Sequence, residues 1–351
     1  MVATWFAACS DDYADVIETP GSADITDTID SDTISRPSTI MRIIYSINGI
    51  GDRSYSDSIY AAACQLENSN TDLAVEHVSP KSQEALEESI RDWFEIDTTM
   101  AHPRRLLVLT SVNNYDQILR SHPEWQCHGD DAVLLLDMQP LQAPDTPNFY
   151  SRYIKIYGAA FEAGYMAYLL GCKKPVIIFP NYSQFPLNVV DDGFLHGYQD
   201  FDGTEMDLTL YYLADDSSYS NYEDAESLYH WCYDNDGKYD FIMPLCGGSS
   251  YGAYRYSRER SVYTIGIDGD MQDYSKNIIA SIVKRSNLLL IDFVTQWMNH
   301  EEQPQVEIYG LESDYEKLIV SKNLKTLIPG IDSQIKQIHH AAIEYEYDYD
   351  Y

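Results

Sequence analysis

Three short polar turns hold the residues that could do chemistry, and each directly follows a strand-like apolar run. In the first, residues 48–60, two glycines allow a tight backbone turn, and the serines from Ser54 to Ser58 offer caps at a helix start. The third glycine of a dinucleotide-binding fingerprint is absent. Tyr55 instead places an aromatic ring where it could lie flat against a ligand ring.

The second turn, residues 247–252, spells G-x-S-x-G from Gly248 onward. As a nucleophile elbow, it would make Ser250 the nucleophile of an α/β-type serine hydrolase. The acids and bases that follow in the required chain order are Asp268 or Asp292 and then His300 or His339. Because the pattern is short and its spacing permissive, we favour the alternative, a glycine-rich turn that holds a ligand without reacting.

The third turn, residues 265–270, places Asp268 and Asp270 just past a strand end. They are poor calcium ligands, because Asp273 and Ile279 stand where a calcium loop needs glycine and glutamate, so no metal is expected. A carboxylate at a strand terminus suits acceptance from vicinal hydroxyls, such as those of a ribose. The alternative is a solvated acidic turn.

The composition limits the function. The chain has 351 residues, with 56 acidic and 23 basic side chains and a net charge of −33. This length allows two domains, and the charge argues against nucleic-acid binding, which needs clustered Lys and Arg. Apolar residues make up 44%, too many for a disordered chain, and no apolar run reaches the roughly 18 residues of a membrane span. We therefore expect a soluble, globular body.

The N-terminal segment resembles the end of a bacterial lipoprotein signal. Residues 1–8 are apolar and close with small residues before Cys9, which would become the lipidated N-terminus of the mature chain. Residues 9–40 are acidic and rich in Ser, Thr, Pro and Gly, which is typical of a disordered tether. The alternative is a buried apolar N-terminus with an ordinary cysteine. The other five cysteines form no CxxC pair and indicate neither a disulfide framework nor zinc.

From Met41 on, short strand-like runs alternate with longer helical patterns, which predicts an α/β fold with parallel sheets covered on both faces. In such folds a ligand binds at the carboxyl ends of the strands. We expect residues 344–351, which alternate Tyr with acidic residues, to be a frayed tail, or alternatively an added edge strand. The strand-like runs are residues 42–47, 106–109, 132–136, 176–179, 208–212, 241–243 and 262–267.

Six segments, taken in order, resemble the basic membrane protein (BMP) family, also called the purine nucleoside receptor A-like family, of substrate-binding lipoproteins. The similarity runs from about Met41 to Leu311. No single motif is decisive, but six in the right order and spacing are hard to obtain by chance. The segments are Gly-Asp-Arg-Ser-Tyr at 51–55, Ala-Phe-Glu-Ala-Gly-Tyr at 160–165, Asp-Gly-Phe-Leu-His-Gly at 192–197, Pro-Leu-Cys-Gly-Gly at 244–248, Ile-Gly-Ile-Asp-Gly-Asp at 265–270 and Ala-Ser-Ile-Val-Lys-Arg at 280–285.

The resemblance implies a type I periplasmic-binding-protein fold. Two Rossmann-like α/β lobes with parallel sheets would be joined by three crossovers, with the ligand held in the cleft between them. We expect residues 41–152 and 270–300 to form the first lobe, and residues 153–269 and 301–343 the second.

The resemblance also implies site residues. Tyr55 and Tyr219 would be aromatic plates around a base, and Asp268 would accept hydrogen bonds from ribose hydroxyls. Lys284 would reach the sugar or steady Asp268, and Asp52 would order the first turn. Further positions expected at the site are Gly247 and Gly248, which would let backbone approach the sugar, and Ser56, which replaces the Asn of the family. Gly158 stands where the family has an acidic residue.

The expected function is that of a non-enzymatic, lipid-anchored solute-binding protein of the bacterial cell envelope. It would capture a purine nucleoside for uptake by an ABC transporter permease, without a cofactor. Two alternatives stay open: a serine hydrolase using Ser250, and a surface-exposed binding protein for a ligand other than a nucleoside.

Overall fold

The computed structural model describes residues 37–47, 49–96, 102–110, 115–138, 147–180, 187–200, 203, 205–213 and 222–349. Cys9, the expected signal remnant and nearly all of the expected tether lie outside the described residues, as does Tyr219. From Pro37 to Tyr351 the chain forms one compact unit.

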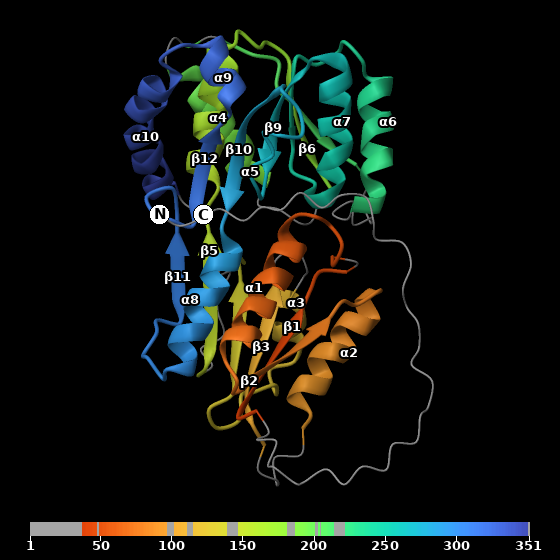
Figure 1. The fold of residues 1–351 in the computed structure, drawn as a ribbon, viewed down its shortest axis with the longest axis vertical. Coiled ribbons are helices and arrows are strands. Elements are labelled where there is room, and N and C mark those ends of the chain that lie inside the picture. Colours follow the sequence, from red (N-terminus) through yellow and green to blue (C-terminus); the bar gives the residue numbers. More distant parts are fainter. Residues whose placement is uncertain are drawn as a thin grey trace, which may run out of the picture. The chain divides into compact units, whose positions relative to one another are not determined.

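The described chain contains two six-stranded sheets, which belong to two lobes (Figure 1). Neighbouring strands are parallel throughout sheet A, and in sheet B only β12 is antiparallel to its neighbour. Sheet A has the order β11 (Val306–Tyr309), β5 (Phe149–Ile154), β4 (Ala132–Leu136), β3 (Arg104–Thr110), β1 (Thr39–Ile44), β2 (Leu73–Val78). Sheet B has the order β12 (Glu316–Val320), β10 (Ile278–Lys284), β9 (Tyr263–Ile267), β8 (Phe241–Pro244), β6 (Pro175–Phe179), β7 (Thr209–Tyr212).

Helices cover both faces of each sheet, because the central strands are apolar on both sides. On sheet A, α1 (Tyr55–Ser69) and α8 (Ser286–Met298) share one core, and α2 (Gln83–Phe94) and α3 (Tyr115–Ser121) share another. On sheet B, α4 (Tyr157–Leu169), α5 (Leu187–Gln199) and α10 (Ile331–Asp348) lie over one face, with the short α9 (Lys322–Leu327). The other face packs against α6 (Ala225–Asp234) and α7 (Ser250–Arg260).

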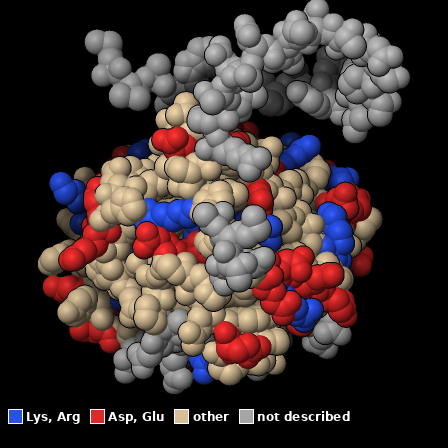
Figure 2. Space-filling model, turned by 90° about the horizontal axis from the view of Figure 1, so that it is seen from below, with Lys and Arg blue, Asp and Glu red and all other residues tan. Residues whose placement is uncertain are grey.

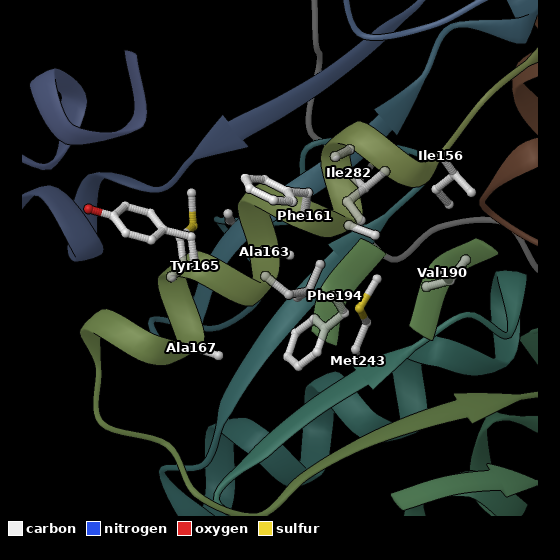
Figure 3. Close-up of a cluster of buried hydrophobic side chains, with 14 of the residues drawn as sticks. Ile156, Phe161, Ala163, Tyr165, Ala167, Val190, Phe194, Met243 and Ile282 are labelled. Carbon is white, nitrogen blue, oxygen red and sulfur yellow. The ribbon is translucent and has the colours of Figure 1, made fainter. Parts of the chain in front are cut away.

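The largest core lies between α4, α5 and sheet B (Figure 3). Phe161 and Phe194 point into it from the two helices, and Met243 and Ile282 from the strands. A Cβ at Gly164 would collide with the carbonyl oxygen of Phe194, so glycine is what lets α4 and α5 approach this closely. This packing holds α4, the helix that follows β5, against sheet B.

The expected α/β architecture with three crossovers is confirmed. The chain passes between lobes after β5, after β10 and between β11 and β12. Two boundaries differ from those expected from the sequence: β10 lies in sheet B, although residues 270–300 were assigned to the first lobe, and β11 lies in sheet A. The second crossover therefore falls at Lys284–Ser286, because β10 is buried between β9 and β12 before the chain crosses.

The C-terminal tail is helical, so the expectation of a frayed end or an edge strand is wrong. Helix α10 continues to Asp348. Its tyrosines at positions i and i+4 face α4 and α5: the Tyr345 ring lies 4.2 Å from that of His196, and the Tyr349 hydroxyl donates to Asp192 at 2.7 Å. Packing on these helices stabilises a segment whose alternating composition gives no helical signal.

Candidate ligand-binding site

The first and third turns singled out in the sequence meet in the structure. Ser54 precedes α1 in the first lobe, and Asp268 follows β9 in the second. The Ser54 hydroxyl donates to Asp268 Oδ2 at 2.6 Å, across 214 residues of sequence. Both turns lie at carboxyl ends of parallel strands, where α/β folds bind ligands.

Asp52 orders the first turn from within. Its side chain is buried and accepts hydrogen bonds from the backbone N–H groups of Ser54, Ser56 and Asp57 at 2.8–3.1 Å. Burial raises the pKa of Asp52 to about 6, although these three hydrogen bonds act in the opposite direction. With its oxygens directed at the start of α1, Asp52 shapes the turn that presents Ser54.

The side chains of Tyr55 and Ser56 make contacts within the first lobe. Tyr55 is half-buried and packs against the core between α1, α8 and sheet A, with its hydroxyl 3.4 Å from the Leu136 carbonyl oxygen. Ser56 is 1% exposed, and its hydroxyl lies 3.5 Å from that of Ser46. Ser56 therefore has little surface to offer a ligand in this arrangement.

Asp268 has an uncommon backbone conformation and charged neighbours from both lobes. Its φ angle is +64°, in the left-handed region that non-glycine residues seldom adopt. Burial raises the pKa of Asp268, the Ser54 hydrogen bond and the charge of Lys284 lower it, and the charge of Asp137 raises it. The Asp268 carboxylate therefore lies at the boundary between the lobes, bonded to Ser54 and near the charges of Lys284 and Asp137.

Lys284 ends β10 at the second crossover and pairs with a carboxylate that the sequence analysis missed. Its Nζ lies 2.8 Å from Oδ1 of Asp137, which follows β4 in the first lobe. Asp137 also accepts from the Ile154 N–H and the Ser286 hydroxyl, at 3.2 and 3.1 Å. The available signal was the position of Asp137 directly after the apolar run 132–136. Lys284 therefore acts on Asp268 through its charge while bonded to Asp137.

The glycine-rich turn after β8 is a short 3-10 helix at residues 247–249. Gly247 has φ +50°, a conformation that favours glycine, and Gly248 is buried. Ser250 is fully buried: it donates to the Pro244 carbonyl and accepts from the Cys246 N–H, both at 3.1 Å. His339, one proposed base, instead bonds Glu162 on α4 at 2.7 Å. The hydrolase interpretation is therefore wrong, because the Ser250 hydroxyl is bonded within its own turn.

The described part of the chain shows no metal centre. No cluster of three His, Cys, Asp or Glu side chains there could hold a metal ion. None of the described helices combines the length and apolar character that crossing a membrane requires. On the face shown in Figure 2, acidic and basic side chains are interspersed and form no continuous basic patch.

Comparisons with known proteins agree with this architecture. The family model of Bmp, described as ABC transporter substrate-binding protein PnrA-like, matches residues 143–345. No match was found among the curated proteins.

Solved structures share the fold at low sequence identity. A transcriptional activator of the comK gene from Bacillus halodurans is 13% identical with a TM-score of 0.60, covering 87% of this chain and 97% of its own. A solute-binding protein of an ABC transporter system from Aeropyrum pernix K1 is 16% identical with a TM-score of 0.60, covering 89% and 87%. A periplasmic solute-binding protein from Actinobacillus succinogenes with bound D-allose is 15% identical with a TM-score of 0.58, covering 82% and 99%.

The family match covers more than half of the chain and agrees with the two α/β lobes and their three crossovers. Substrate-binding proteins of ABC transporters hold a small molecule without transforming it, which agrees with the buried, backbone-bonded Ser250. The chain belongs to the Bmp family of PnrA-like ABC-transporter substrate-binding proteins.

Proposed function

We propose that the protein captures a purine nucleoside between its two lobes and delivers it to an ABC transporter permease. The observation that carries the proposal is the Asp268 carboxylate, which follows a strand of the second lobe and reaches Ser54 of the first at 2.6 Å. A ligand held there would contact both lobes. Ribose hydroxyls would donate to Asp268, and charge-assisted hydrogen bonds of this kind are about twice as strong as neutral ones.

The base would be recognised by stacking. Tyr55 stands at the start of α1, two residues after Arg53, and Tyr219 is the second proposed plate. Stacking of a base on an aromatic ring contributes about 1–3 kcal/mol and suits any base, so the polar contacts must set the choice among nucleosides. The glycine turn at 247–248 would allow backbone to approach the sugar, because it carries no side chains.

A nucleoside should stabilise the full chain carrying Cys9→Ser. In a thermal-shift and urea-unfolding panel, the correct nucleoside at a hundredfold excess over its dissociation constant should add about 2.7 kcal/mol to the free energy of unfolding. Mass spectrometry of molecules released on denaturation should identify the same compound. D-allose, ribose and free purine bases serve as controls. Stabilisation by a sugar but by no nucleoside would contradict the proposed ligand and leave the family assignment intact.

We also propose that Cys9 is lipidated and anchors the protein outside the cytoplasm through the acidic segment 9–40. Expressed in a bacterial host behind a complete lipoprotein signal, the wild-type chain should enter the membrane fraction and incorporate labelled palmitate. The Cys9→Ser variant should be soluble and unlabelled, because only the cysteine thiol accepts the lipid. Equal membrane association of the two proteins would contradict the anchor.

A further inference from the structure

Arg53 and Ser54 of the first lobe make three contacts with the second lobe. Ser54 donates its hydroxyl hydrogen to Asp268 at 2.6 Å. The Arg53 carbonyl accepts from the Tyr251 hydroxyl at 3.1 Å, and the Arg53 guanidinium lies 4.1 Å from the centroid of the Tyr222 ring. These contacts unite the turn after β1 with η1 (Tyr222–Asp224), α7 and the end of β9.

The Ser54 hydroxyl is fixed from its own lobe. Ser54 is 8% exposed, and its N–H donates to the buried Asp52 carboxylate at 2.8 Å. Its carbonyl accepts from the Ser58 N–H at 3.1 Å, in the first turn of α1. A side chain with backbone bonds on both sides presents its hydroxyl in one direction.

Hydrogen bonds within the second lobe constrain the backbone on both sides of Asp268. The Ile267 N–H, one residue before it, donates to the buried Tyr254 hydroxyl at 3.0 Å. The Gly269 N–H, one residue after it, donates back to the Ile267 carbonyl at 2.8 Å. The left-handed backbone of Asp268 then directs its carboxylate at Ser54. The Ser54 hydrogen bond constrains the side-chain torsion angles of Asp268 further, because it holds one carboxylate oxygen.

Arg53 makes a second contact between the lobes, beside the hydrogen bond from Ser54 to Asp268. Its φ angle is +53°, so the turn holds it in an uncommon conformation. Its guanidinium stacks on Tyr222, whose ring meets that of Tyr251 edge-on at 5.3 Å, and Tyr251 meets Tyr274 at 5.1 Å. The second lobe thus offers an aromatic cluster that a cation from the first lobe contacts.

We propose that Ser54 is a positioning residue of the ligand site, which orients the Asp268 carboxylate across the lobe boundary, and that Arg53 fastens the lobes beside it. The inference rests on the proposed function in taking Asp268 as the ligand's acceptor. Its consequence is preorganisation: the acceptor is aligned and the lobes are held together before the ligand arrives. Less of the ligand's binding free energy is then offset by the cost of ordering the Asp268 side chain and closing the two lobes.

The test compares Ser54→Ala with Ser54→Thr, which keeps the hydroxyl, and with Ser58→Ala. Ser58 is a matched control because its hydroxyl bonds the Tyr55 carbonyl in the same helical turn. Two readouts need no ligand. Carbon-13 NMR follows the Asp268 carboxyl, assigned with Asp268→Asn, and energy transfer between dyes on unnatural amino acids at the exposed Tyr60 and Tyr233 follows the distance between lobes.

Ser54→Ala should raise the pKa of Asp268, since the hydrogen bond that lowers it is gone, and shift the dye pair to longer separations. Arg53→Ala should lengthen the separation with a smaller change in that pKa. For guanosine, inosine and adenosine, Ser54→Ala should weaken binding about tenfold, and Ser54→Thr should restore most of it.

An unchanged Asp268 pKa together with unchanged energy transfer in Ser54→Ala would overturn the proposal, whether or not a nucleoside binds. If both ligand-free readouts shift as expected but the wild type binds none of the three nucleosides, the ligand assignment fails and the positioning role of Ser54 stands. Equal effects of Ser54→Ala and Ser58→Ala would reduce Ser54 to a helix-start residue and also overturn it.

Discussion

Asp268→Asn is expected to weaken nucleoside binding by two to three orders of magnitude without destabilising the free protein. Hydrogen bonds to a charged group contribute about 1.5–3 kcal/mol each, so losing the charge opposite two ribose hydroxyls costs about 3–4 kcal/mol. Because burial raises the pKa of this carboxyl, removing the charge also removes a desolvation penalty. The free energy of unfolding should therefore stay constant or rise.

Asparagine is the informative substitution because the φ angle of +64° at this position is tolerated by Asn and Asp but disfavoured for Ala. Asp270→Asn is the matched control: Asp270 is exposed, two residues further on, and bonds only Gln272 within the described residues. Isothermal titration calorimetry measures the nucleoside affinity, and urea unfolding measures the free energy of unfolding. Nucleoside affinity that is equal in wild type and Asp268→Asn would exclude Asp268 as the sugar acceptor.

The two-lobe α/β fold could be predicted because its central strands are apolar runs that local pattern reveals. The runs at 106–109 and 132–136 became β3 and β4, buried on both faces of sheet A. Five of the described strands were missed. Three of them, β2, β11 and β12, lie at sheet edges, carry polar residues and are only partly buried, whereas β5 and β10 are interior strands with polar residues, such as Arg152 and Ser281, inside them. Their strand conformation depends on the neighbour that they pair with, which local sequence does not show.

The site was predictable only in its separate pieces. The turns containing Ser54 and Asp268 stand out as polar loops after strands, but nothing local tells that they meet across 214 residues. The resemblance led to Lys284 beside Asp268, and the structure pairs Lys284 with Asp137, which no motif pointed to. Side-chain partners at the lobe boundary depend on how two sheets face each other, which is a property of tertiary packing.

The second large effect is expected at the crossovers, where the C-terminal helix supplies a buried carboxylate. Glu346 of α10 accepts from the Gly158 N–H at 2.9 Å and from the Leu311 N–H at 2.7 Å, and its backbone carbonyl accepts from Lys155 at 2.8 Å. Gly158 and Leu311 belong to the first and third crossovers. A Cβ at Gly158 would come within 3.2 Å of the Glu346 carboxyl carbon, so this carboxylate lies beside the position where the family has an acidic residue.

Glu346→Ala should lower the free energy of unfolding by about 2–6 kcal/mol, because two buried N–H groups lose their acceptor at about 1–3 kcal/mol each. It should also widen the distribution of distances between lobes in the ligand-free protein, since two of the three connections would no longer share a rigid partner. Glu344→Ala is the control on the same helix: Glu344 is exposed and pairs only with His340 at 3.3 Å among the described residues, so its loss should change stability by less than about 0.5 kcal/mol.

Two buried carboxyls, those of Glu316 and Glu346, lie close together in this region, and both have raised pKa values. Glu316 is fully buried, and burial raises its pKa far above the usual value; the nearby charge of Glu346 adds to the shift and that of Lys284 opposes it. The pKa of Glu346 is also raised by burial, while its two backbone hydrogen bonds and Lys155 act against the shift and Glu312 adds to it. Since like charges this close disfavour double ionisation, the folded protein favours a proton on Glu316 more strongly than the unfolded chain does.

A folded-state pKa above the unfolded value of 4.5 means that the native protein binds the proton more tightly than the unfolded chain. The free energy of unfolding should then fall as the pH rises above about 4.5, and continue to fall until Glu316 ionises in the folded state. Glu316→Gln, which mimics the protonated side chain, should remove this part of the slope and be more stable than wild type at pH 8. Parallel pH profiles of the free energy of unfolding in wild type and Glu316→Gln would contradict the protonation of Glu316 in the folded state. For Glu346, a loss of unfolding free energy in Glu346→Ala no larger than in Glu344→Ala would contradict the prediction that α10 stabilises the crossovers.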